Sequence, residues 1–77
     1  MLLSGQATLI GLEQKHGVKD PNKVYSRALL QDGLDTIQVL CNDDVYTILS
    51  AGEMYVTYDI VLDYNTKYNS MRLVEVS

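Results

Sequence analysis

Apolar and polar residues alternate along several short stretches of this 77-residue chain. The clearest stretch runs from Met54 to Asp63, where Val56, Tyr58, Ile60 and Leu62 occupy every second position. Successive residues of a strand point to opposite faces of a sheet, so this period of two predicts a strand. Its even-numbered side chains are expected in the core.

The same reasoning predicts four more strands, rich in Val, Ile, Thr, Tyr and Leu. They are expected at Ala7–Lys15, Lys23–Gln31, Leu34–Cys41 and Met71–Val76. In the second of these, Val24, Ser26, Ala28 and Leu30 are expected on one face and Tyr25, Arg27 and Leu29 on the other. Turn signals separate the strands: the loop 17–22 holds the only proline, and Asp32-Gly33 predicts a tight hairpin because glycine accepts a positive φ.

The region between the third and fourth strands is less regular. Asn42-Asp43-Asp44 is a turn or a helix N-cap, and Val45–Leu49 fits a single helical turn or a short strand equally well. The pattern as a whole predicts an all-β fold, a five-stranded antiparallel meander with at most one short helical turn. At this length it suits a small barrel of the oligonucleotide-binding (OB) type or an SH3-like barrel, since closure removes exposed strand edges.

Chain length predicts one domain, residues 1–77, close to the lower limit for a self-sufficient core. Dimerisation would add burial. The single cysteine, Cys41, excludes an internal disulfide and sits in an apolar run, so we expect it to be buried. No signal peptide is visible, which favours the cytoplasm, and apolar runs are far shorter than the roughly 20 residues that cross a bilayer.

Charge changes this picture. The net charge is -4, yet four of the six Lys and Arg residues lie in one short stretch: Lys15, Lys19, Lys23 and Arg27. Such a segment can be directed at an anion such as a nucleic-acid backbone, although many exposed hairpins carry lysines and bind nothing. Tyr25 lies among these cations and offers a ring on which an unpaired base could stack.

Little in the sequence predicts catalysis or metal binding. His16 is the only histidine and has no partner at ligand spacing. Asp59 and Asp63 share a predicted strand face but would stand roughly 13 Å apart, too far for one ion. With no nucleophile–base pair and no phosphate loop, we expect a non-enzymatic protein without a cofactor, a metal or a small-molecule substrate.

Three segments resemble the filamentous-phage gene V proteins, a family of single-stranded DNA-binding proteins. Asn22-Lys23-Val24-Tyr25-Ser26 is similar to the family's Gly-Lys-x-Tyr-Ser segment. The segment 50–56 is similar to its Ala-Pro-Gly-Leu-Tyr-x-Val entry into the fourth strand, and 68–74 to its aromatic-Gly-Ser-Leu loop and terminal Arg-Leu-Val strand. The resemblance covers about residues 7–76.

The resemblance implies an OB-type barrel, a twofold homodimer and a DNA-binding hairpin at residues 15–27, which we call the wing. Tyr25 and Lys23 match the family's stacking tyrosine and the lysine before it, and Tyr68 matches its later aromatic. Lys15, Lys19 and Arg27 lie near the family's wing cations without aligning one to one, and Lys67 stands beside Tyr68. The expected function is sequence-independent binding of single-stranded DNA in phage or mobile-element replication.

An acidic face supports a different class of function. Asp43, Asp44, Glu53, Asp59 and Asp63 could form a surface for a basic protein partner, which would account better for the net charge. A structural component of a viral assembly is a third alternative. These alternatives differ in where the carboxylates gather on the folded chain.

Overall fold

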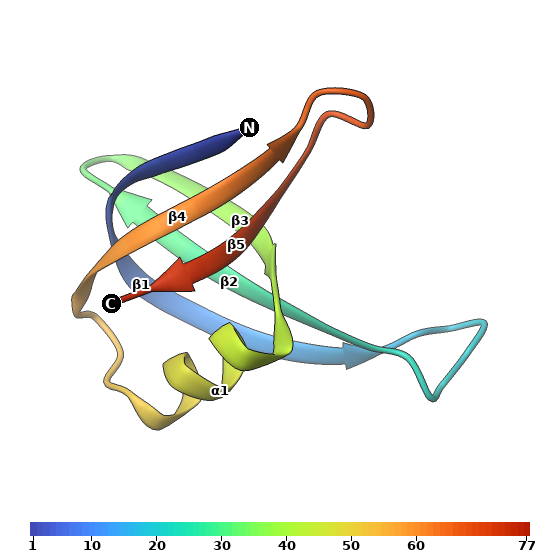
Figure 1. Ribbon diagram of the computed structural model, residues 1–77. Helices are drawn as coiled ribbons and strands as arrows, with labels where there is room; N and C mark the ends of the chain where they lie inside the picture. Colours follow the sequence, from blue (N-terminus) through green and yellow to red (C-terminus); the bar gives the residue numbers. More distant parts are fainter.

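Five strands close into a barrel, and one helix lies across one end of it (Figure 1). The computed structural model describes residues 1–77. The elements are β1 (Leu2–His16), β2 (Val24–Asp32), β3 (Asp35–Cys41), α1 (Asp43–Ala51), β4 (Thr57–Asn65) and β5 (Ser70–Val76). The all-β class and the small five-stranded barrel are therefore as predicted.

The strand order is β1-β2-β3-β5-β4, which corrects the expected meander. The long β1 pairs with β2 through residues 8–16 and with β4 through residues 2–8, so it closes the barrel. β3 and β5 are parallel, with Leu40 opposite Arg72 and Cys41 opposite Leu73, while every other pair is antiparallel. The crossover through α1 carries the chain past β3, so β5 takes the place beside it. This closed five-stranded arrangement is OB-like.

The core is one cluster of ten buried side chains inside the barrel. They are Ala7, Leu9, Ala28, Leu30, Val39, Cys41, Val45, Leu49, Ile60 and Leu73. Ser26, Ala28 and Leu30 are buried while Tyr25 and Leu29 are exposed, which confirms the expected face of the second strand from Ser26 onwards; Val24, expected on the same face, is exposed at the start of the strand. Cys41 is buried as expected, and loss of hydration raises the pKa of its thiol from the usual value of 9.0.

The helix is nine residues long rather than a single turn. Val45 and Leu49, four positions apart, share one face of α1 and are both buried in the core, so tertiary packing favours the helix over a strand. Asp43 and Asp44 lie in the first turn, where carboxylates stabilise the positive end of the helix dipole. Asn42 is the N-cap by backbone geometry, but its side chain makes no capping bond.

Two strand boundaries differ from the prediction by three residues or more, and the others agree within two. β1 begins at Leu2 rather than Ala7, because residues 2–6 pair with β4 although they show no alternation of their own. β4 begins at Thr57 rather than Met54, because Tyr55 has a positive φ of 63° that no strand accommodates. The hairpin between β2 and β3 forms where expected, with Gly33 at a φ of 63°.

Candidate nucleic-acid interface

The wing is a hairpin that extends from the barrel (Figure 1). Its loop is closed by backbone bonds from Gly17 N to the Lys23 carbonyl (2.8 Å) and from Lys23 N to the Asp20 carbonyl (3.0 Å). The Asp20 side chain accepts a bond from Asn22 N at 3.1 Å. His16 Nδ1 lies 3.2 Å from the Pro21 carbonyl, so the histidine belongs to the loop. Lys19 and Lys23 are exposed and free of ion pairs.

Tyr25 lies directly opposite Lys15 in the β1–β2 register, so the two side chains share the outer face of the barrel. The tyrosine is 44% exposed. A Cβ placed on Gly17 would approach Tyr25 Cε2 to 3.3 Å, which means that the ring packs along the loop backbone. This contact orients the ring and leaves part of it open to a ligand.

Arg27 is the next outward residue of β2 and faces Glu13 across the sheet. Glu13 also lies 3.8 Å from Lys15 Nζ and accepts a 3.4 Å bond from Gln38. This carboxylate therefore neutralises part of the positive charge at the base of the wing. Such an exposed pair is weak and gives way readily to a stronger anion.

Arg72 joins this face, although no pattern in the sequence singles it out as a site residue. Leu40 of β3 is opposite Arg27 on one side and opposite Arg72 on the other, so the two arginines flank it across three adjacent strands. Neighbouring strands lie about 4.8 Å apart, which places the two arginine backbones roughly 10 Å from each other. Arg72 Nη1 also donates to Asn42 Oδ1 at 3.2 Å. Only the parallel β3–β5 register reveals this arrangement.

A groove of about 410 Å³ runs over Leu40, Asn42 and Arg72, and Arg27 lies beside it without lining it. Tyr25 and Arg72 line it from opposite sides, with Leu40 between them. Asp43 lines it too and contributes one negative charge. Burial raises the pKa of the adjacent Cys41 thiol. The charge of Arg72 lowers this pKa and that of Asp43 raises it, but burial has the largest effect, so the thiol remains protonated at neutral pH. The groove thus offers a ring and a guanidinium rather than a nucleophile.

Lys67 and Tyr68 lie in the loop between β4 and β5, separated from the wing in Figure 1. Tyr68 is 69% exposed, and Lys67 Nζ lies 5.4 Å from the centre of its ring. The Asn65 side chain accepts bonds from both backbone amides, at 3.0 and 3.3 Å, and so shapes the turn. The seven expected site residues therefore divide into a wing group of five and a loop pair.

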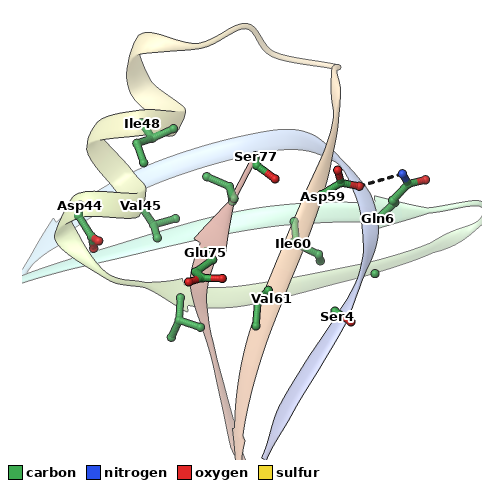
Figure 2. Close-up of a pocket in the computed structure, with 13 residues that line it drawn as sticks. Ser4, Gln6, Asp44, Val45, Ile48, Asp59, Ile60, Val61, Glu75 and Ser77 are labelled. Carbon is green, nitrogen blue, oxygen red and sulfur yellow. Dashed lines mark hydrogen bonds between the residues drawn. The ribbon is translucent and has the colours of Figure 1, made fainter.

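The carboxylates of the alternative acidic face do not gather in one place. Asp44 and Asp59 line a second groove, between α1 and the strands (Figure 2). Asp43 lies in the Tyr25 groove, and Asp63 is opposite Arg72 in the β4–β5 register. Glu53 follows the helix. The acidic residues that share a groove are thus fewer than expected, and Glu75 joins them there.

No group of three or more potential metal ligands occurs in the structure, and none of its helices has the length and apolar character needed to cross a membrane. Neither the protein-family models nor the curated proteins contain a match to this chain. The gene V resemblance therefore stays a prediction, and the functional argument depends on the geometry of the site.

Proposed function

We propose that this protein binds single-stranded DNA without sequence preference, through the outer face of β2 and β3 and the wing. One observation carries the proposal: Arg27 and Arg72 flank Leu40 on adjacent strands, and Tyr25 lines the same groove as Leu40 and Arg72. OB barrels bind oligonucleotides on the face of strands 2 and 3 and at the loops that flank it. In this chain Tyr25 and Arg27 lie on the outer face of β2, and Arg72 lies on the neighbouring strand β5.

The residue types explain why the ligand would be single-stranded. Every base has a π-face, so an exposed ring such as Tyr25 stacks on any base that is not already paired. In a duplex, the bases are stacked on each other and the ring has no access. Binding by stacking and phosphate attraction requires no hydrogen bonds to base edges, so it carries little sequence preference.

Each cation has a separate role along the path of the strand. Arg27 and Arg72 hold phosphates on either side of Leu40, while Lys15, Lys19 and Lys23 extend the positive surface along the wing. Lys67 and Tyr68 provide a further stacking position at the β4–β5 loop. Because the net charge is -4, the protein as a whole does not attract DNA, and only the cations of this face do. Salt screens these exposed charges, so DNA binding should weaken as the salt concentration rises.

The gene V resemblance adds an oligomeric state and a biological role to the proposal. It adds a twofold homodimer, in which Tyr68 of one subunit reaches the strand held by the other, and a role in phage or mobile-element replication. No reaction is part of the proposal, because the buried, protonated Cys41 offers no nucleophile.

The test is a comparison of two tyrosine variants, Tyr25→Ala and Tyr55→Ala. Tyr55 is 76% exposed and lies outside the groove, so it controls for loss of an exposed ring. Loss of one stacked base costs roughly 1–3 kcal/mol, so Tyr25→Ala should weaken binding to a labelled oligo-dT roughly 5- to 150-fold. Tyr55→Ala should bind like the parent. Equal affinity of both variants, with unchanged circular dichroism, would remove Tyr25 from the interface.

A further inference from the structure

A second groove, of about 630 Å³, lies where α1 meets β1, β4 and β5 (Figure 2). Its apolar part consists of Val45, Ile48, Ile60, Val61, Val74 and Val76. Ile48 is 51% exposed, so the groove presents an open apolar surface as well as the buried side chains at its base. A surface of this kind is suited to an apolar side chain from another molecule.

Carboxylates surround this apolar surface. Asp44, Asp59 and Glu75 line the groove, and no lysine or arginine does. None of the three is in an ion pair, and the only side-chain bond recorded for them is the one that Asp59 accepts from Gln6 at 2.8 Å (Figure 2). The groove therefore carries an unneutralised negative charge that favours a basic, partly apolar segment.

The chain itself contains a segment with this chemistry. Val18 at the tip of the wing is 102% exposed, and it is followed by Lys19 and then by Lys23 at the far side of the loop, both without ion pairs. The wing extends to the lower right of the barrel in Figure 1, whereas the starts of β4 and α1 and the end of β5 lie to its left. A wing cannot reach the groove of its own barrel.

We propose that the wing of one molecule docks into the acidic groove of a second copy of this chain. Val18 contacts the apolar surface around Ile48, while Lys19 and Lys23 pair with Asp44 and Glu75. The two surfaces of this contact are different, so it is heterologous and propagates head to tail into a ring or an open filament. Wing and groove complement each other in charge and in hydrophobicity, whereas two wings or two grooves repel.

Charge reversal on each surface tests the contact in the absence of DNA, so the result is independent of the proposed function. One variant carries Asp44→Lys and Glu75→Lys, a second carries Lys19→Glu and Lys23→Glu, and a third carries all four changes. All four positions are exposed, and Asp44→Lys loses only the modest helix-dipole stabilisation in the first turn of α1, so the fold should tolerate the changes. Sedimentation velocity over a concentration series, at roughly 50 and 200 mM salt, measures association of the parent and of each variant.

The parent is expected to form larger species as its concentration rises at low salt, and to lose them at high salt. Each double reversal should abolish this growth, and the fourfold variant should restore it, which misfolding cannot do. A parent that does not grow beyond a dimer as its concentration rises would overturn the proposal, since a twofold dimer does not use this contact. Growth beyond a dimer that survives either double reversal, or that the fourfold variant fails to regain, would overturn it as well.

Discussion

The two grooves of this barrel differ in charge although they lie on one small domain. In the groove beside β2 and β3, Arg72 balances Asp43, and Arg27 and the wing lysines add positive charge next to it, while the groove beside α1 joins Asp44, Asp59 and Glu75 with no cation. Net charge averages over both and gives -4, which by itself argues against a nucleic-acid partner. The partner of a small domain is thus decided by local charge, since the field of an exposed charge decays within about 8 Å at physiological salt.

Both grooves depend on one core, so the largest effect should come from breaking it. Leu73 is fully buried between β3 and β4. Leu73→Ala should lower the free energy of unfolding by about 2–5 kcal/mol and disturb both grooves together. Leu34→Ala is the control, because Leu34 is 101% exposed in the β2–β3 turn. Urea denaturation of both variants measures the difference, and equal midpoints would show that Leu73 does not hold the sheet together.

The next effect separates the two grooves by charge. Arg27→Gln combined with Arg72→Gln should reduce the slope of log affinity against log salt by about 1.4, because each phosphate contact to a single strand contributes about 0.7. Neutralising the other groove with Asp44→Asn and Glu75→Gln should leave the slope unchanged at low protein concentration. Oligo-dT titrations at several salt concentrations give these slopes. A change in the second variant as large as in the first would mean that charge acts over the whole molecule.

A smaller effect should come from the backbone beneath Tyr25. A Cβ on Gly17 would lie 2.8 Å from the Asp20 carbonyl oxygen and 3.3 Å from the tyrosine ring, so Gly17→Ala must displace the loop. We expect a loss of stability of about 1 kcal/mol, at the low end of the range for overpacking, and weaker DNA binding. Gly5→Ala is the matched control, because nothing lies within 4 Å of its added Cβ. Thermal melts and oligo-dT titrations compare the two variants. Equal melting temperatures and equal DNA affinities of Gly17→Ala and Gly5→Ala would contradict the packing argument.

The smallest effect concerns Cys41, behind the Tyr25 groove. Burial raises the pKa of its thiol, so the unfolded chain loses this proton at lower pH than the folded chain does. The thiol's contribution to stability is complete below the ordinary pKa of 9.0 and is lost as the pH rises through the raised value. Cys41→Ser has no thiol to ionise, so its stability should fall less between pH 8 and pH 10. Denaturant titrations at both pH values measure this, and parallel losses would exclude the thiol.

The strands that sequence alone predicted are those whose own residues alternate. Ala28 and Leu30 of β2 alternate with Arg27 and Leu29, and the structure buries the expected face. Residues 2–6 show no such pattern, and they form strand because β4 lies beside them. Similarly, Val45–Leu49 was ambiguous locally, and burial of Val45 and Leu49 in the barrel makes it helical. Pairing and burial between distant segments decide these cases.

The candidate site also combines residues that local sequence predicts with residues that only the fold brings together. Tyr25 and the wing lysines lie close together in sequence, so composition and spacing were enough to single them out. Arg72 lies 45 positions beyond Arg27 and meets it only through the parallel pairing of β3 with β5, which a predicted meander excludes. Glu75 was not predicted to join the acidic residues, because Asp44, which lines the same groove, lies on α1, far from β5 in sequence.

Single-strand binding itself can be measured by a fluorescence-anisotropy titration of the unmodified protein against labelled oligo-dT and a duplex of equal length, at roughly 50 and 200 mM salt. We expect micromolar or tighter binding to the single strand that weakens as salt rises, with much weaker binding to the duplex. No binding to oligo-dT at low salt, or equal affinity for the duplex, would contradict the proposal.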